Sequence, residues 1–202
     1  AFQHRRLGRV LDVVLVDGLN PFGFDHLLPR GLLREPVAGL KRADVTILTR
    51  ADQTTDDARE SVWQEVSRWL PGQSPVEVAF EPCGLLGLDG AAVPVASLTE
   101  PVVAFCGIGN PAAFQQTLHD AGVSVAEFRT FPDHHDYSTD EVARLVELLR
   151  DSHAGALVTT LKDLVKLREI APPDLRLFAL DIRATVVRGS DQLAAAIDSL
   201  RK

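Results

Sequence analysis

Val102-Val103-Ala104-Phe105-Cys106-Gly107-Ile108-Gly109-Asn110-Pro111 is the stretch that decides the fold of the second half of this chain. Its first five residues are apolar and predict a short strand. Asn110 is a favoured helix cap and Pro111 suits the first helical turn, so a helix begins directly after the glycine turn. The stretch therefore predicts one strand–turn–helix unit of an α/β fold.

The same alternation of strand and helix extends in both directions. Toward the C-terminus, strands are expected at 123–131, 156–159 and 175–180, and helices at 139–150, 162–168 and 191–200. Toward the N-terminus, apolar strands at 11–17 and 45–49 precede a helix at 56–70, which Pro71 and Gly72 end. Strands that alternate with helices predict parallel pairing with right-handed crossovers, so the fold class is α/β.

The region between these two halves has a different character. Residues 76–80 alternate between apolar and polar, 85–88 are apolar, Asp89-Gly90 is a tight-turn pair, and 93–98 are extended. This pattern predicts a two-stranded antiparallel ribbon. We therefore expect one α/β part at 1–75, a ribbon linker at 76–100 and a smaller α/β domain at 101–202.

Composition excludes several classes of function. The formal net charge of −7 argues against a nucleic-acid-binding protein, because affinity for phosphate backbones depends on clustered Lys and Arg. Cys83 and Cys106 are too few for a disulfide framework or a cysteine metal cluster, so we expect reduced thiols. The chain contains no apolar run long enough to cross a bilayer and no secretory leader. A soluble or peripheral protein is expected.

The segment Phe131-Pro132-Asp133-His134-His135-Asp136-Tyr137 places two imidazoles between a strand and a helix. Ser138 and Glu141 have capping-box spacing, so the helix begins immediately after this segment. The partial positive charge of a helix N-terminus favours a neutral, basic imidazole or a bound anion. A proton-transfer role for His134 or His135 follows. The alternative is that one histidine caps the turn while the other is merely exposed.

Two further polar residues follow predicted strands. Asp17 ends the first strand, where ligands bind in open α/β sheets, and is a candidate magnesium ligand; an aspartate that opens a turn has the same pattern. Lys162 follows Thr160 at another strand end and is a candidate contact for an anion; the alternative is a solvated lysine at a helix start.

The glycine turn at 107–109 also fits the looser G-x-G-x-x-A form of the dinucleotide fingerprint, with Glu127 as the acidic residue. Glu127 falls within a predicted strand rather than at its end. Pro111 also removes one backbone donor that a phosphate would use. A plain strand-to-helix turn is the preferred interpretation.

Several motifs, taken in order, resemble those of the tetraacyldisaccharide 4'-kinase family, which acts in lipid A biosynthesis. They are Phe2-Gln3-His4-Arg5-Arg6-Leu7, Asp12-Val13-Val14-Leu15-Val16-Asp17, Pro21-Phe22-Gly23, Leu28-Pro29-x-Gly31-x-Leu33-Arg34-Glu35-Pro36, Lys41-Arg42-Ala43-Asp44, Phe105-Cys106-Gly107-Ile108-Gly109-Asn110-Pro111, Phe131-Pro132-Asp133-His134-His135-x-Tyr137 and Leu157-Val158-Thr159-Thr160-x-Lys162-Asp163. The resemblance runs nearly from end to end of the chain.

This resemblance implies an enzyme that uses ATP and Mg²⁺ to transfer a phosphoryl group to the 4'-hydroxyl of an acylated glucosamine disaccharide 1-phosphate. It also implies that residues 1–75 are the carboxyl-terminal part of a P-loop kinase domain, joined by the ribbon to the smaller α/β domain, with the active site in the cleft between them. The acyl chains of the substrate imply a peripheral protein on the cytoplasmic face of the inner membrane.

The chain departs from the family pattern at its beginning. It starts at Ala1, where the family has a glycine, and G-x-x-x-x-G-K-[ST] occurs nowhere in it. We expect it to be a carboxyl-terminal portion of the kinase. Because positioning of the ATP phosphates supplies most of the catalysis in phosphoryl transfer, this portion alone is expected to be inactive.

The resemblance implies a catalytic histidine in the Asp-His-His motif. We predict His135 as the base, with His134 as the second candidate and Asp133 as the carboxylate that orients the ring.

Further site residues are expected near the N-terminus. Gln3, His4 and Arg5 are predicted to lie near the acceptor or the metal–phosphate site. Arg34 is a candidate phosphate contact and Glu35 a candidate magnesium ligand through water, with an ion pair between them as the alternative. A hypothesis of another class remains open: a non-catalytic α/β module that binds an anionic ligand or a dinucleotide at the Gly107 turn and the histidines.

Overall fold

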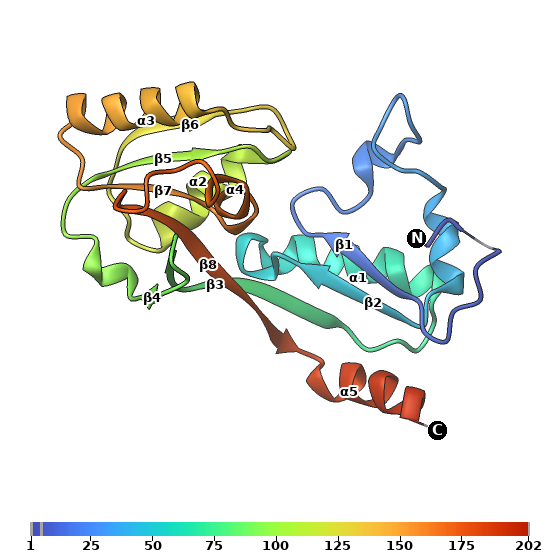
Figure 1. Ribbon diagram of the computed structural model, residues 1–202. Coiled ribbons are helices and arrows are strands. Elements are labelled where there is room, and N and C mark those ends of the chain that lie inside the picture. The colour runs from blue at the N-terminus through green and yellow to red at the C-terminus, as the bar shows by residue number, and fades with distance from the viewer. Residues whose placement is uncertain (1, 5, 202) are drawn as a thin grey trace. The chain divides into compact units, whose positions relative to one another are not determined.

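Strands and helices alternate through most of the computed structural model, which describes residues 2–4 and 6–201 (Figure 1). The strands are β1 (Val13–Asp17), β2 (Val45–Thr49), β3 (Val76–Gly87), β4 (Ala92–Val93), β5 (Val102–Cys106), β6 (Val125–Thr130), β7 (Ala156–Thr160) and β8 (Leu177–Arg188). The α-helices are α1 (Asp56–Trp69), α2 (Pro111–Asp120), α3 (Thr139–Asp151), α4 (Leu161–Leu167) and α5 (Ser190–Asp198). The predicted α/β class is confirmed.

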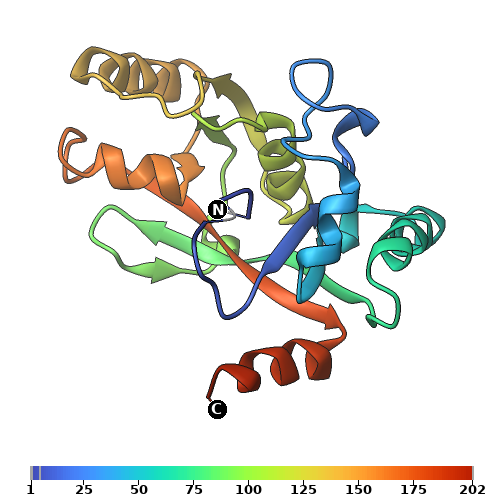
Figure 2. The same ribbon diagram turned by 90° about the vertical axis from the view of Figure 1, so that its right-hand side faces the viewer.

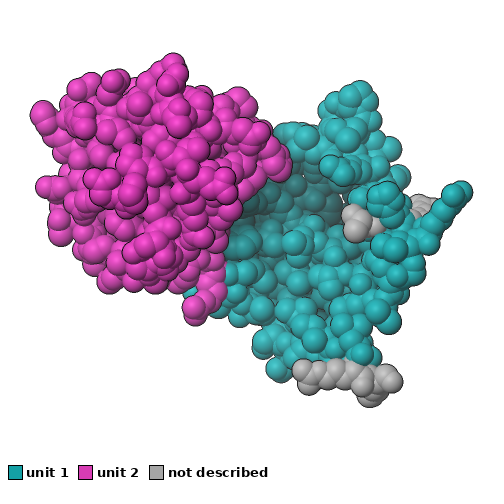
Figure 3. Space-filling view, in the orientation of Figure 1, with its two compact units in different colours: residues 1–81, 184–202 teal, residues 82–183 magenta. Residues whose placement is uncertain are grey.

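The chain divides into two units, coloured separately in Figure 3. Unit 1 comprises residues 1–81 and 184–202, and unit 2 comprises residues 82–183. The chain passes from one unit to the other within β3 and returns within β8. Side-chain contacts join Glu81 to Thr185 and Cys83 to Asp181, so these two long strands run antiparallel.

Unit 1 is built on the parallel strands β1, β2 and β3. The inner stripe of α1 packs on one face of this sheet because Val62, Trp63 and Val66 recur with helical spacing. The opposite face is covered from the C-terminal segment, whose Val186, Leu193 and Ala196 pack on a second core of Val45, Ile47, Val76 and Val78. The last residues of the chain are therefore part of the unit that the first residues form.

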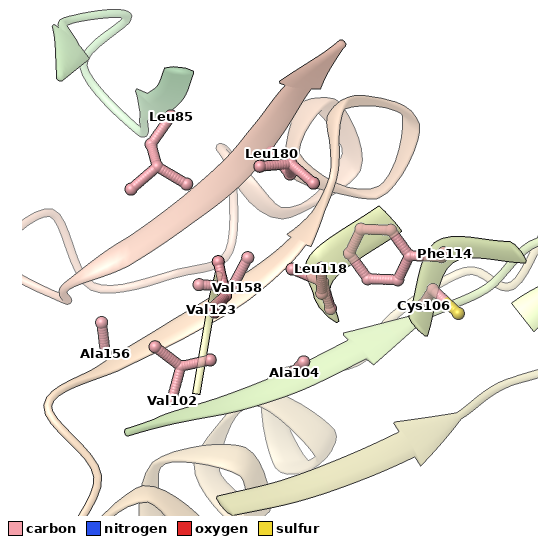
Figure 4. Close-up of a cluster of buried hydrophobic side chains, with 10 residues drawn as sticks. All are labelled: Leu85, Val102, Ala104, Cys106, Phe114, Leu118, Val123, Ala156, Val158 and Leu180. Carbon is pink, nitrogen blue, oxygen red and sulfur yellow. The ribbon is translucent and has the colours of Figure 1, made fainter. Parts of the chain in front are cut away.

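Unit 2 has helices on both faces of the parallel strands β8, β7, β5 and β6. Alternate residues of β5 point to opposite faces. Val102, Ala104 and Cys106 join the core that α2 covers with Phe114 and Leu118 (Figure 4). Val103 and Phe105 join the core that α3 and α4 cover. β5, predicted from the apolar residues 102–106, is thus a central strand that is buried on both faces.

The structure differs from the sequence prediction at both ends of unit 2. The predicted strand at 175–180 continues to Arg188, because its second half pairs with β3. The pieces predicted at 76–80 and 85–88 are one continuous strand, whereas 95–97 form a 3-10 turn and only Ala92–Val93 pairs back on β3. Consequently residues 184–202 lie in unit 1, not with the domain predicted at 101–202.

Candidate functional site

The histidine segment lies between β6 and α3, in unit 2. A reciprocal capping box ends the turn: the Glu141 N–H donates to Ser138 Oγ (3.3 Å), and the Ser138 N–H donates to Glu141 Oε2 (2.9 Å). The predicted helix start is therefore confirmed. Both histidines lie just ahead of the positive end of α3.

His135 is held tightly at this position. Its ring stacks on Phe131 with centroids 4.9 Å apart, and it meets the ring of Tyr137 edge-on at 4.9 Å. Its Nε2 lies 3.0 Å from Glu141 Oε1. Hydrogen bonds from Ser138, with a smaller contribution from His135, lower the pKa of Glu141, so this carboxylate is ionised at neutral pH. When Nε2–H donates to Glu141, the Nδ1 lone pair of His135 has no partner among the described residues and can accept a proton.

His134 has a different environment. Its backbone adopts a φ of 61°, its N–H donates to Asp133 Oδ1 (2.9 Å) and Gly107 O (3.2 Å), and its side chain is 77% exposed. Asp133 also accepts a hydrogen bond from Lys162 Nζ (3.0 Å), which lowers the pKa of the Asp133 carboxyl. The carboxylate in contact with His135 is thus Glu141 and not Asp133, because Asp133 is turned toward Lys162 and the His134 backbone.

Two lysines of α4 bind the histidine segment from the same side. Lys162 reaches Asp133, and Lys166, one helical turn later, donates to His134 O (2.8 Å), His135 O (2.5 Å) and Asp136 Oδ1 (3.2 Å). Lys166 was not among the site residues predicted from the sequence. Its spacing of four residues from Lys162 places both on one helix face, and this could have identified it.

Asp163 is a buried carboxylate beneath the turn. Its Oδ2 accepts from the Gly107 N–H (3.0 Å) and from Thr160 Oγ1 (2.7 Å). Burial, followed by the charge of Asp163, raises the pKa of the Tyr137 hydroxyl, which is therefore protonated. The Gly107 N–H donates to Asp163 and is not available to a phosphate, which favours the plain strand-to-helix turn over the alternative of a dinucleotide fingerprint.

A Cβ on Gly107 would lie 3.1 Å from His135 Cβ, 3.1 Å from the Tyr137 hydroxyl and 3.2 Å from Asp163 Oδ1. Only glycine fits here without displacing a neighbour. The β5 turn, the histidine segment and the start of α4 therefore meet at one point.

The site residues predicted near the N-terminus lie in unit 1. Gln3, Arg34 and Glu35 line one pocket of about 180 Å³. Glu35 accepts two hydrogen bonds from Arg42 Nη2 (2.9 and 2.8 Å), so its ion pair is with Arg42 rather than Arg34. The carbonyl of His4 accepts from Arg9 Nη1 (2.9 Å). The prediction for Arg5 falls outside the described residues.

The two predicted metal ligands do not form a metal site. Asp17 Oδ2 lies 2.5 Å from Arg50 Nη1 and its Oδ1 accepts from the Leu19 N–H, while Glu35 is engaged by Arg42. Among residues 2–4 and 6–201, no three His, Cys, Asp or Glu side chains are grouped so that they could hold a metal ion. Guanidinium groups already neutralise both carboxylates, so the described residues do not fit a magnesium ion held by protein ligands.

Comparisons with known proteins agree on one family. A family model described as tetraacyldisaccharide-1-P 4'-kinase matches residues 1–202. Relatives named tetraacyldisaccharide 4'-kinase include those of Anaeromyxobacter sp. (strain Fw109-5), 42% identical over 98% of this chain and 53% of the relative, and Halothermothrix orenii, 32% identical over 98% and 55%. The crystal structure of the "apo" form of LpxK from Aquifex aeolicus in complex with ATP has a TM-score of 0.66 at 32% identity, over 98% of this chain and 54% of that one. The chain spans about half the length of these relatives.

Proposed function

The chain belongs to the tetraacyldisaccharide-1-P 4'-kinase family, and we propose that it takes part in transfer of the γ-phosphoryl group of ATP to the 4'-hydroxyl of an acylated glucosamine disaccharide 1-phosphate. The observation that carries this proposal is the His135–Glu141 pair, held at 3.0 Å ahead of the α3 N-terminus. ATP is proposed as the donor because the related crystal structure contains it.

In the proposed mechanism, His135 is the general base. A sugar hydroxyl is a weak nucleophile, and a neutral imidazole within hydrogen-bond reach removes its proton as the new P–O bond forms. Glu141 accepts the hydrogen bond from Nε2–H, which keeps the ring in one orientation and leaves Nδ1 as the proton acceptor. Once Nδ1 is protonated, the ionised Glu141 stabilises the imidazolium, as the carboxylate does in a catalytic triad.

The positions of several other residues suggest roles in substrate binding. Arg34 is exposed, has no ion pair among the described side chains and lines the same pocket as Gln3, so we propose that both contact a phosphate of the substrates. For His4 and Arg5 a substrate-binding role is proposed from the family resemblance alone. Lys162 is bonded to Asp133, so we propose that it contacts an anion only when the anion replaces Asp133 as its partner. Magnesium would arrive with the ATP phosphates, and neither Asp17 nor Glu35 is assigned to it.

Replacement of His135 by alanine tests the proposal. In the protein that contains this sequence, we expect turnover to fall by about 10²–10⁴-fold, with little change in the KM for ATP. His134→Ala is the matched control, because the His134 ring is exposed and its only contact with a charged group among the described residues is a distant one, 3.9 Å from Nε2 to Asp133 Oδ2. Phosphate transfer is followed with ATP and the acylated disaccharide 1-phosphate. Equal turnover in His135→Ala and the unmodified protein would reject the role of His135.

The proposed substrate also indicates a membrane as the binding partner. An acylated disaccharide resides in a bilayer, so we propose peripheral contact with the cytoplasmic face of the inner membrane. None of the helices in the described part of the chain is both long and apolar enough to span a bilayer.

A further inference from the structure

Residues 20–33, here called the leucine loop, form a protruding loop of unit 1 with apolar side chains turned to solvent. Phe24 is 70% exposed, Leu32 60%, Leu28 56% and Leu27 46%. The loop stands away from β1 and β2 of the same unit (Figures 1 and 2). Four of the fifteen exposed large hydrophobic residues among those described thus lie within this one loop. Single exposed leucines are ordinary, but such a concentration marks a binding surface.

The leucine loop has a defined backbone. The Leu28 N–H donates to Leu33 O (2.9 Å), the Leu33 N–H to His26 O (3.1 Å) and the Leu32 N–H to Gly23 O (2.9 Å). A Cβ on Gly31 would lie 2.3 Å from His26 O, so the turn closes too tightly for any other residue. These hydrogen bonds give the loop a fixed backbone path, so its apolar side chains are presented to solvent in one arrangement.

Charge around this loop is opposite to that of the whole chain. Residues 1–42 contain seven Lys and Arg against four Asp and Glu, whereas residues 43–202 contain fourteen against twenty-four. Arg6, Arg30, Arg34 and Lys41 are exposed and make no ion pair with any described residue. Asp25 is the exposed acid of the loop. The apolar surface is therefore embedded in a basic segment of an acidic protein, which selects an anionic partner.

From this combination we infer that the leucine loop docks on the surface of an anionic lipid bilayer, with Leu27, Leu28, Leu32 and Phe24 in the headgroup boundary and Arg30 at the lipid phosphates. Stable reversible binding to a bilayer needs both an apolar insertion and a basic component, and this loop supplies both. The choice of a lipid rather than a protein surface rests on the proposed function, whose substrate carries acyl chains.

Vesicle co-sedimentation tests the inference without ATP or substrate. The probes are vesicles of phosphatidylethanolamine and phosphatidylglycerol in a 3:1 ratio, and vesicles of phosphatidylcholine alone. We expect the triple variant Leu27→Ser, Leu28→Ser, Leu32→Ser to lower the partition coefficient on anionic vesicles by about tenfold or more. The matched control replaces Ile182, Val187 and Ile197, which are similarly exposed, by serine and is expected to bind as the unmodified chain does.

A single charge variant tests the electrostatic part. Arg30→Gln keeps the apolar side chains and is expected to weaken binding to anionic vesicles by about fivefold, with little effect on phosphatidylcholine vesicles. Circular dichroism establishes that each variant is folded. Equal binding of the leucine triple variant and its control, or no binding by the unmodified chain, would overturn the inference.

Kinase turnover on detergent-dispersed substrate separates the two proposals. If the leucine loop does not bind membranes but the enzyme assignment is right, the unmodified protein turns over substrate and the triple substitution leaves vesicle binding unchanged. If the enzyme assignment fails, vesicle binding still reports on the loop.

Discussion

At the scale of single residues, Gly107 shows how closely the histidine segment is packed. Its missing side chain leaves room for His135, Tyr137 and Asp163, each within 3.2 Å of the place a Cβ would take. Its N–H and carbonyl join Asp163 below to His134 above. A small change at this one residue is therefore transmitted directly to the proposed base.

We expect Gly107→Ala to destabilise the protein by about 1–3 kcal/mol, because the added methyl group overpacks a closed turn. The matched control is Gly109→Ala in the same turn, where the nearest atom is 3.4 Å away and the contact is an ordinary one. Urea unfolding measures the stability, and the imidazole NMR signals of His135 report the displacement of the ring. Equal stability of the two alanine variants would contradict this account of the turn.

The lowered pKa of Glu141 predicts that the stability of the folded protein depends on pH. This pKa is lower in the folded protein than its ordinary value of 4.5, so ionised Glu141 stabilises the folded state above that value. The stabilisation is lost as the pH falls through the folded-state pKa. We expect Glu141→Gln to be less stable than the unmodified chain at pH 7, and the difference to shrink below pH 4.5. Urea unfolding as a function of pH measures it; a difference that stays constant with pH would refute the prediction.

At the scale of elements, side chains of α4 hold the histidine segment before α3 in place through hydrogen bonds. Lys162 and Lys166 project from one face of α4 and donate four hydrogen bonds to residues 133–136. Lys166 binds backbone carbonyls, whereas Lys162 binds a side chain. The backbone path of the histidines thus depends mainly on Lys166.

We expect Lys166→Met to raise the amide exchange rates of residues 134–136 by about tenfold, since the two carbonyls lose a charged donor. Lys162→Met, which removes only the bond to Asp133, is the control and should have the smaller effect. Hydrogen exchange followed by NMR distinguishes the two. Identical exchange in both variants would show that the lysines do not hold the segment.

At the scale of the whole molecule, the C-terminal segment completes unit 1. Val186, Leu193 and Ala196 cover the core of β2 and β3, and Arg188 Nη1 lies 3.3 Å from the buried Glu77 Oε1. Glu77 also accepts a hydrogen bond from Trp63 Nε1 (2.9 Å), so α1, β3 and β8 are tied together within this unit.

Truncation after Arg183 is therefore expected to destabilise unit 1 by at least about 3 kcal/mol, because it uncovers the second core and leaves Glu77 with fewer partners. Amide protection in β1 and β2 should be lost while that of β5 and β7 remains. Truncation after Asp198 leaves both cores covered and serves as the control. Protection in β1 and β2 that survives removal of residues 184–202 would be inconsistent with this assignment.

Local sequence patterns were sufficient to predict most of the helices and strands and to identify the family. The apolar runs of β1, β2, β5 and β7 and the caps of α2 and α3 depend on near neighbours in sequence, and the structure confirms them. The predicted family resemblance is confirmed by the family model and the relatives. The second half of β8 escaped prediction because its strand character comes from β3, which is about a hundred residues away in sequence.

The sequence by itself determined that an α/β protein of this kinase family carries two histidines ahead of a helix, because caps and periodicity act over three or four residues. Only the tertiary structure decided which carboxylate contacts His135, that Lys166 and Asp163 hold the turn, and that Arg42 and Arg50 occupy the predicted metal ligands. Gly107 with Asp163, His134 with Lys166 and Asp17 with Arg50 are each more than thirty residues apart in sequence, and such long-range pairs leave no local pattern in the chain. Glu141 and Arg42 are only six and seven residues from their partners, and there the direction in which the folded turn points each side chain decides the contact.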